Sequence, residues 1–276
     1  MDLLYANGEI TSAILSAGGG VRASPSDMKQ FDKIHQQYTK VRPTYPVAVY
    51  DEIAVDLHAV PADLAVDIAC GSGQSIDGLK RIAKKIIGMD IGSNLLADAR
   101  KRHPDITFVQ GCGEAPGLDP EIADLVTIAT AFYWMDRAKV VENVSSLLKP
   151  HGVFAVYKYD FPWLLDPRNS IVKRHLAEKW DNHRSPRLKN FDHDTPDLIA
   201  ASRRFEKVRQ YTIENHVRMS VSQYVDFMAS TSYVSKFVTE EVGNDSYLEG
   251  FTEELRRAGG EQLVVNFDIT MVVASR

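Results

Sequence analysis

The amino-acid sequence predicts an α/β protein built on a doubly wound, mostly parallel sheet, and three observations lead to this prediction. Short apolar runs alternate with helical patterns over residues 46–160, and strands separated by helices pair in parallel through right-handed crossovers. One apolar run stops at two glycines one residue apart, Gly71 and Gly73. A second run ends in an acid, Asp90. Polar and glycine residues therefore gather at the sheet edge where such folds bind ligands.

The expected elements alternate up to residue 160. A helix is expected over residues 46–60, and a helical pattern over 136–149 ends at a Lys-Pro-His-Gly stop signal. The strands of this half are expected at residues 64–70, 85–90, 106–111, 123–131 and 153–159.

After residue 160 the rhythm changes, because helical stretches follow one another without strands between them. A turn-rich segment, 161–168, precedes helices expected near 169–183 and 195–205, which we interpret as a helical lid over the sheet edge. The remaining elements are an extended run, two helices and one buried final strand, expected at residues 207–219, 221–237, 245–258 and 262–274.

Length and charge exclude several classes of protein. A chain of 276 residues lies near the upper limit for one compact domain. Its net charge of -5 and isoelectric point of about 5.9 argue against nucleic-acid binding, which needs a basic face. Asp2 stands where a signal peptide carries positive charge, and no apolar run approaches the ~20 residues that cross a bilayer. We therefore expect a soluble, cytoplasmic protein that binds neither nucleic acid nor membrane.

The two cysteines, Cys70 and Cys112, have neither C-x-x-C spacing nor a neighbouring histidine. Thiolate metal sites need such groups of ligands. No metal site is predicted, and the thiols are expected to be reduced.

The turn at Gly71 and Gly73 predicts a cofactor site. Without a Cβ, these residues adopt backbone angles closed to others and let a ligand lie against the main chain. The dinucleotide fingerprint G-x-G-x-x-G needs a third glycine, and Ile76 stands in its place. An NAD-dependent oxidoreductase is therefore a less favoured alternative.

Asp90 is expected to hold a ribose. An acid at the tip of a second strand accepts both ribose hydroxyls, which fixes the sugar with two bonds to one carboxylate. The alternative is a strand-end aspartate that caps the following helix, for which Ser93 is the better candidate.

Residues 65–73, Ala-Val-Asp-Ile-Ala-Cys-Gly-Ser-Gly, resemble the first motif of the class I S-adenosylmethionine (SAM) methyltransferases. In that family an acid before the turn faces the methionine end of the cofactor, and Asp67 fills this place. The resemblance implies a Rossmann-like sheet of seven strands, mostly parallel, with the last strand antiparallel. It also implies SAM as cofactor, bound in addition by Ala69, Gly71, Gly73, Ile91 and Ala129.

The expected end of the third strand, within residues 108–116, departs from the family. An aspartate there commonly accepts from the adenine amino group, whereas this chain has Cys112. The backbone amide of Gly113 and a neighbouring side chain are expected to hold the base instead, so Cys112, Gly113 and Glu114 are assigned to the cofactor. Glu114 is equally consistent with a surface or helix-capping carboxylate.

Three consecutive aromatics, Phe132, Tyr133 and Trp134, follow the fourth expected strand. The tract resembles the A-x-A-F-H-W-x-D segment of the trans-aconitate methyltransferase-like group (methyltransferase type 11), with Tyr133 where histidine often stands. The resemblance assigns all three to the substrate, with Tyr133 at the reaction centre for orientation. The alternative is that Phe132 and Trp134 are ordinary core aromatics.

Residues 38–46 match the Y-x-x-x-R-P-x-Y-P motif of the same group, which folds over the cofactor. Tyr38 and Arg42 are therefore assigned to cofactor binding. The planar guanidinium of Arg42 suits the methionine carboxylate of SAM or an acidic substrate. A surface ion pair is its alternative role.

Together these features predict a SAM-dependent methyltransferase that acts on a small organic acceptor, with a carboxylic acid first by analogy. A SAM-binding regulator without activity is the alternative from another class, supported by Cys112 alone. A nucleic-acid base methyltransferase is disfavoured, because Thr130-Ala-Phe-Tyr-Trp134 replaces the expected Asn/Asp-Pro-Pro-aromatic motif.

The chain is accordingly divided into four expected segments. They are an N-terminal arm that could support a homodimer, a SAM-binding core, a helical lid, and C-terminal elements that complete the sheet and cover the acceptor: residues 1–30, 31–160, 161–205 and 206–276.

Overall fold

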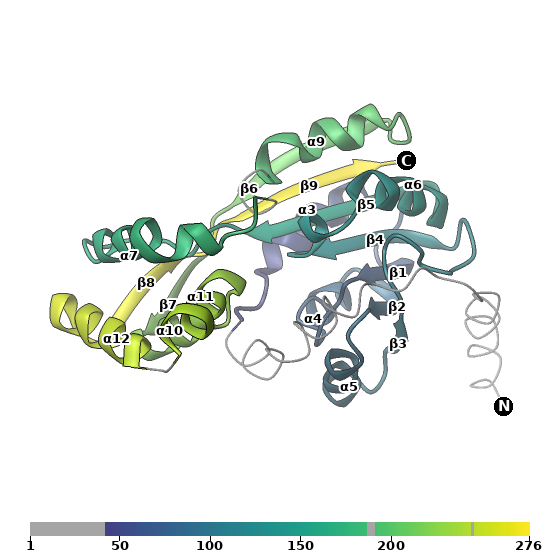
Figure 1. The fold of residues 1–276 in the computed structure, drawn as a ribbon. Coiled ribbons are helices and arrows are strands. Elements are labelled where there is room, and N and C mark those ends of the chain that lie inside the picture. Colours follow the sequence, from purple (N-terminus) through teal and green to yellow (C-terminus); the bar gives the residue numbers. More distant parts are fainter. Residues whose placement is uncertain (1–41, 187–190, 244–245) are drawn as a thin grey trace.

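The computed structural model describes residues 42–186, 191–243 and 246–276, and its centre is a seven-stranded sheet with strand order β3-β2-β1-β4-β5-β9-β6 (Figure 1). The strands are β1 (Ala62–Ile68), β2 (Ala83–Asp90), β3 (Thr107–Gln110), β4 (Ala123–Ala129), β5 (Leu148–Tyr159), β6 (Lys207–Ile213) and β9 (Ile269–Ser275). Strands β1 to β5 pair in parallel, and β9 lies antiparallel between β5 and β6. The predicted Rossmann-like architecture is confirmed.

Helices cover both faces of the sheet, as a doubly wound fold requires. The helices of one face are α3 (Val47–Asp56), α4 (Ile76–Leu79) and α5 (Ser93–Arg102), and those of the other are α6 (Arg137–Leu147) and α9 (Phe191–Ala201). Side chains alternate between the two faces along each strand. Leu125 of β4 therefore packs with the first group of helices, and the next residue, Val126, packs with the second.

The C-terminal strands differ from the prediction, because both long extended runs are broken in two. The first run forms β6 and β7 (His216–Ser220), and the expected final strand forms β8 (Gln262–Asn266) and β9. Strands β7 and β8 pair in a separate two-stranded sheet. The break lies where Asp268 Oδ1 accepts from the Asn215 amide at 2.8 Å and Phe267 N–H donates to Asn215 O at 2.8 Å. These bonds join the two runs across the bend.

A second apolar cluster surrounds β7 and β8. The helical elements in this cluster or beside it are α7 (Asn169–His175), η2 (Leu176–Trp180), η3 (Asp181–His183), α10 (Val221–Ala229), α11 (Ser232–Phe237), η4 (Val238–Val242) and α12 (Ser246–Gly259). Large aromatics such as Trp180, Phe251 and Phe267 are fully buried in it. It forms the left-hand body of the molecule in Figure 1.

The helix expected over residues 221–237 is interrupted between α10 and α11. There the hydroxyls of Ser230 and Thr231 donate to the carbonyls of Phe227 and Met228, each at 2.6 Å. Such local bonds compete with the helical ladder.

The segment expected as a lid packs in two places. The elements α7 and η2 belong to the second apolar cluster and η3 contacts η2 and α11 beside it, whereas Ile199 of α9 packs beside α6 in the core of the sheet. Only the first of these two parts lies in the same body as α10 and α11.

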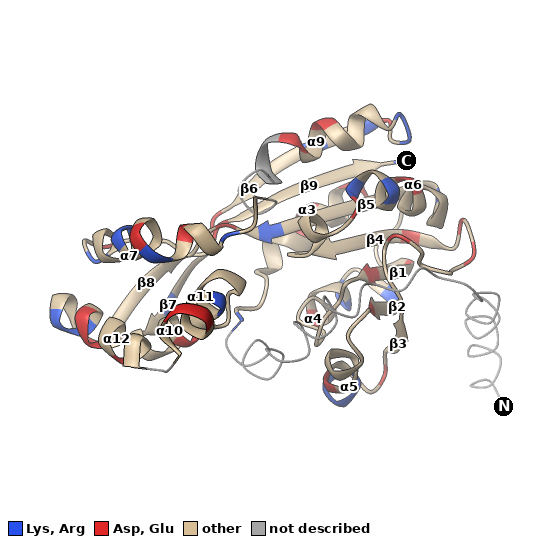
Figure 2. Cartoon of the chain, in the orientation of Figure 1, with Lys and Arg blue, Asp and Glu red and all other residues tan. Residues whose placement is uncertain are grey.

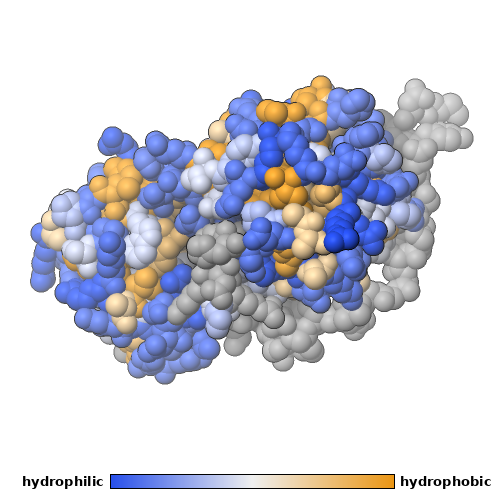
Figure 3. Space-filling model, turned by 90° about the horizontal axis from the view of Figure 1, so that it is seen from above, coloured by the Kyte–Doolittle hydropathy of each residue, from blue (hydrophilic) through white to orange (hydrophobic). Residues whose placement is uncertain are grey.

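None of the helices in the described ranges is long and apolar enough to span a membrane. On the face seen in Figure 3, the coloured surface shows apolar residues in separate groups among hydrophilic ones.

Candidate cofactor and acceptor site

The carboxyl ends of β1 and β4 carry two strained residues. Ala69 has a φ of 57° and Thr130 a φ of 54°, a left-handed conformation that costs a residue with a Cβ about 1–2 kcal/mol. Such strain persists where the surrounding structure enforces it, and it concentrates at functional sites. The two strands are neighbours in the sheet, so this observation alone directs attention to their shared edge.

The glycine turn follows Ala69 at once. Gly71 has a φ of 56°, and within the described residues a Cβ there would meet the Gln74 side chain alone, at 3.8 Å. The backbone conformation is therefore what favours glycine at this position. Gly73 has a φ of 86°, and its Cβ would lie 2.8 Å from Cδ2 of His103. The buried His103 ring also reaches Gly73 O with Nε2 at 3.0 Å. The turn therefore packs against His103, the residue that follows α5 (Ser93–Arg102).

Asp90 connects the end of β2 to this turn. Its Oδ2 accepts from the Gly71 amide at 2.9 Å, and its Oδ1 accepts from the Gly92 amide at 2.7 Å. Figure 2 shows acidic residues at the ends of β1 and β2. These two bonds orient the Asp90 carboxylate at the turn. Ser93 is the first residue of α5, whose N-cap is Gly92 without a side-chain cap.

Asp67 lies beneath the same edge and is completely buried. Its Oδ1 accepts from the Thr127 hydroxyl at 2.7 Å, while its Oδ2 has no hydrogen-bond partner among the residues that the structure describes. Burial raises the pKa of this carboxyl to about 7. The hydrogen bond from Thr127 lowers the pKa, and the nearby negative charge of Asp90 raises it further. A buried carboxylate oxygen without a partner fits a ligand that brings a positive charge.

A small pocket opens above the turn. It is lined by residues from the ends of β1, β4 and β5, from the turn and from the segment before α3, namely Arg42, Pro43, Tyr45, Ala69, Cys70, Gly71, Gln74, Ser75, Ala129 and Tyr159. Four of these, Arg42, Ala69, Gly71 and Ala129, were predicted from the sequence. Tyr159 was missed, although its place at the end of β5 matches that of Ala129 at the end of β4.

Arg42 joins the two bodies at this pocket. Its Nη1 donates to the Tyr159 hydroxyl and its Nη2 to Ser230 O at 3.3 Å, while its guanidinium carbon lies 4.6 Å from the centre of the Phe227 ring. The Tyr159 hydroxyl and the Ser230 carbonyl are neutral groups, and Arg42 itself belongs to the pocket wall. Tyr45 completes that wall, with its hydroxyl 2.6 Å from Thr130 Oγ1.

The loop after β3 packs closely under α6. A Cβ on Gly113 would meet Ile68 and Val140, each at 3.2 Å, and Gly113 O accepts from the Asn143 amide at 3.0 Å. Glu114 Oε1 accepts from the Asp136 amide at 3.0 Å, at the start of α6. This is the contact that the helix-capping alternative for Glu114 requires.

Two further residues assigned to the cofactor lie at the edges of this region. Cys112 is half-buried, and burial raises its pKa. The carbonyl of Ile91 accepts from the Gln110 side chain at 2.9 Å beyond the end of β2. The roles of Cys112, Gly113, Glu114 and Ile91 toward the cofactor stay predictions.

The three aromatics form the short helix η1 (Phe132–Trp134) and separate into two environments. Phe132 is fully buried, and its ring meets Phe154 edge-on at 6.0 Å in the core of the sheet. This burial favours the core alternative for Phe132. Tyr133 and Trp134 are half-buried, with ring centres 5.3 Å apart, so their assignment to the substrate stays a prediction. Tyr38 lies outside the described residues.

Residues 66–156 match the family model described as a methyltransferase domain. The chain is a class I SAM-dependent methyltransferase. The matched segment includes the glycine turn, Asp67, Asp90 and the aromatic tract, all at the sheet edge described above.

Relatives of this methyltransferase come from several organisms. A Dictyostelium discoideum protein named as a methyltransferase is 26% identical over 257 residues, which cover 90% of this chain and 95% of that one. A Saccharomyces cerevisiae protein named as a SAM-dependent methyltransferase is 32% identical over 145 residues, 50% of this chain and 49% of that one. Trans-aconitate 2-methyltransferase of Acidovorax ebreus is 28% identical over 241 residues, 79% of this chain and 88% of that one.

A solved structure from Anaeromyxobacter dehalogenans, described as a type II methyltransferase, has the same fold. It superimposes with a TM-score of 0.67 at 24% identity and covers 85% of this chain and 97% of that one.

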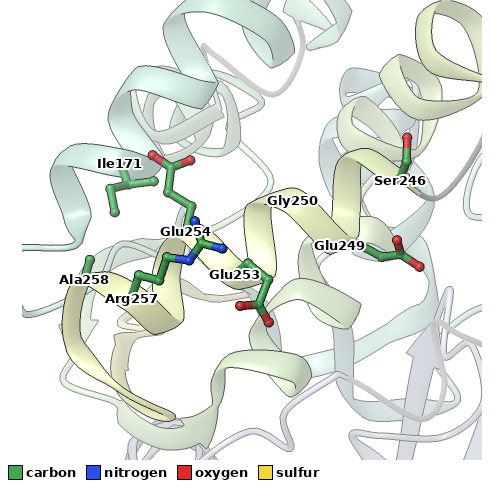
Figure 4. Close-up of a pocket in the computed structure, with 8 residues that line it drawn as sticks. All are labelled: Ile171, Ser246, Glu249, Gly250, Glu253, Glu254, Arg257 and Ala258. Carbon is green, nitrogen blue, oxygen red and sulfur yellow. The ribbon is translucent and has the colours of Figure 1, made fainter.

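A larger hollow on the methyltransferase lies away from the glycine turn. It is an open groove of about 670 Å³ between α7 and α12, and Figure 4 shows its lining. Three carboxylates, Glu249, Glu253 and Glu254, line it together with Arg257. The groove includes none of the predicted site residues, so it is separate from the cofactor site.

Proposed function

We propose that this methyltransferase transfers the methyl group of SAM to a small organic acceptor, with carboxylic acids first. The observation that carries the proposal is the pocket at the ends of β1, β4 and β5, where an arginine and tyrosines stand beside the glycine turn. An arginine fork suits a carboxylate, and the aromatic wall suits an organic body. The name of the Acidovorax ebreus relative points to the same class of acceptor.

The residues of the turn fit SAM on the evidence of their own atoms. The buried Oδ2 of Asp67, which has no hydrogen-bond partner among the described residues, matches an α-ammonium group. The carboxylate of Asp90, oriented by two backbone amides, matches a ribose diol. Gly71 lets a ligand approach the main chain.

When bound, SAM supplies a methyl group activated by a sulfonium sulfur. The task of the chain is then to align the acceptor atom with that methyl group and to keep water out, and alignment supplies most of the rate in such displacements. A carboxylate acceptor is already ionised at neutral pH, so it needs no general base. We propose that Tyr133 and Trp134 orient the acceptor, and that α7 to η3 cover it together with α10 and α11.

The remaining sequence-based expectations belong to the same proposal. They are a cytoplasmic location, an acceptor that is a small molecule, and a homodimer supported by residues 1–30.

Titration calorimetry with S-adenosylhomocysteine tests the cofactor assignments. We expect micromolar binding by the wild-type protein and a loss of at least about tenfold in Asp90→Ala, because each hydrogen bond to a charged group contributes about 1.5–3 kcal/mol. Asp105→Ala is the matched control, since Asp105 pairs with Lys80 at the exposed surface. Equal affinity in Asp90→Ala and wild type would remove Asp90 from the site.

Turnover separates the enzyme from the non-catalytic regulator. Formation of S-adenosylhomocysteine from SAM is measured with a panel of mono-, di- and tricarboxylic acids, followed by alcohols, phenols and amines. Turnover of a carboxylic acid supports the proposal. Binding of S-adenosylhomocysteine without turnover of any member would favour the regulator.

A further inference from the structure

A second arginine, Arg184, lies among aromatic rings of the second apolar cluster. It follows η3, and its guanidinium carbon lies 5.8 Å from the centres of both the Phe161 and the Tyr233 rings. These two rings stack with centres 6.0 Å apart and planes inclined by 23°. Only 20% of the Arg184 side chain is exposed.

Among the described residues, the Arg184 guanidinium makes one long hydrogen bond and has one donor atom without a partner. Its Nη1 reaches Asp181 Oδ1 at 3.4 Å, which is long for a charged hydrogen bond. Its Nε is buried and has no hydrogen-bond partner within the described ranges. A buried donor left without an acceptor costs about 1–3 kcal/mol, so an acceptor oxygen placed beside Nε would stabilise this arrangement.

The position of Arg184 connects it to the cofactor pocket. Phe161 comes two residues after the end of β5, the strand that carries Tyr159 into the pocket wall. Tyr233 lies in α11, three residues after Ser230, whose carbonyl accepts from Arg42. The rings beneath Arg184 are therefore held by the two segments that also hold Arg42.

Both arginines act on the Tyr233 hydroxyl. Burial raises the pKa of Tyr233 to about 12, and the positive charges of Arg184 and Arg42 oppose that rise. The two guanidinium groups thus lie within electrostatic reach of one hydroxyl. Two positively charged groups therefore act on one buried hydroxyl, and the Asp181 carboxylate pairs with Arg184 at 3.4 Å.

We infer that Arg184 recognises the acceptor, with its guanidinium binding a carboxylate of a planar organic anion whose body contacts Phe161 and Tyr233. The inference rests on the proposed function and specifies its acceptor class. A guanidinium offers five donors in a planar fork, which matches a carboxylate better than any neutral group. The Nε of Arg184, which has no hydrogen-bond partner among the described residues, would then donate to that carboxylate.

Binding measurements on the complex with S-adenosylhomocysteine test this inference. Benzoate, trans-cinnamate and trans-aconitate are titrated by calorimetry into protein saturated with S-adenosylhomocysteine, each beside its uncharged amide. We expect at least one carboxylate to bind about tenfold or more tightly than its amide. In Arg184→Met, which keeps much of the apolar stem, this preference should disappear, and in Arg184→Lys it should survive in part.

Arg174→Met is the matched control, because it also removes one positive charge, but Arg174 lies in α7 and pairs with Glu254 of α12. The affinity for S-adenosylhomocysteine itself should be the same in all variants. A carboxylate preference that persists in Arg184→Met overturns the inference, and so does a panel in which no carboxylate binds better than its amide. If the wild-type protein does not bind S-adenosylhomocysteine, the proposed function fails first.

Discussion

Asp67 allows a sharp test of how the cofactor is bound, because the Asp67 carboxyl must lose its proton when S-adenosylhomocysteine binds. Burial raises the pKa of the carboxyl from 3.8 to about 7, so at pH 6 most of the ligand-free protein carries a neutral Asp67. Pairing with the α-ammonium of S-adenosylhomocysteine requires the carboxylate. Binding below pH 7 must therefore release a proton from Asp67.

The size of the effect follows from the linkage between protons and ligand. Below pH 7 the affinity should rise about tenfold per pH unit, and above pH 7 it should level off. Between pH 5 and pH 7 this amounts to about a hundredfold, or roughly 3 kcal/mol. Calorimetry in two buffers with different ionisation enthalpies measures both the affinity and the number of protons released.

The variant Asp67→Asn keeps an oxygen for the Thr127 hydroxyl but cannot titrate. We expect its affinity to be independent of pH in this range and weaker than wild type at pH 8, with no proton release. Asp98→Asn, in which the substituted residue pairs with Lys101 near the surface of α5, should behave as wild type. A wild-type affinity that is flat between pH 5 and pH 7 would refute the role of Asp67.

The same pKa shift has a consequence for the stability of the ligand-free protein. Between about pH 4 and pH 7 the native state keeps a proton on Asp67 that the unfolded state has lost, so stability falls as the pH rises through this window. A shift from 3.8 to about 7 corresponds to about 4 kcal/mol. Urea unfolding of wild type and Asp67→Asn should show that fall only in the wild type.

Three further predictions concern folding and orientation. Gly73→Ala should cost about 1–3 kcal/mol more in urea unfolding than Gly260→Ala, because both have positive φ but only Gly73 has a ring 2.8 Å from the place of its Cβ; equal losses would contradict the contact. Phe132→Ala should destabilise the protein by about 3–5 kcal/mol because the ring is fully buried, whereas Tyr133→Phe, which keeps the ring, should lower kcat with the acceptor. Burial lowers the pKa of His175. The free energy of unfolding should therefore fall as the pH drops below about 6.5, the pKa of histidine in the unfolded chain. His175→Gln should lessen that fall, measured by urea titrations at pH 5 and pH 7.

The parallel half of the sheet and its ligand-binding edge could be predicted from local sequence patterns. Two glycines after an apolar run specify a strand followed by a tight turn wherever the run is paired, and Asp90 ends a run in the same way. Both features depend on neighbours in sequence. The structure accordingly places Gly71 and Asp90 within one hydrogen bond of each other.

The C-terminal bend and the surroundings of Arg184 could not be predicted from local sequence patterns. Buried apolar residues continue through Phe267, so the alternation gives no sign of a break. The break depends on Asn215, some fifty residues earlier, whose amide bonds to Asp268. The contacts of Arg184 could not be predicted for a similar reason, since the Phe161 and Tyr233 rings beside it come from distant segments of the chain.

The place of β9 between β5 and β6 has a consequence for synthesis on the ribosome. Of these three strands β9 is made last, after more than a hundred residues have followed β5. Until then β5 is the edge strand of the parallel half, and β6 lacks β9, the one strand with which it pairs among the described residues. Exposed edges of this kind can pair with the wrong partner. In a nascent chain of this protein the edge of β5 therefore stays unpaired beside the cofactor-binding half until β9 is made and pairs with it.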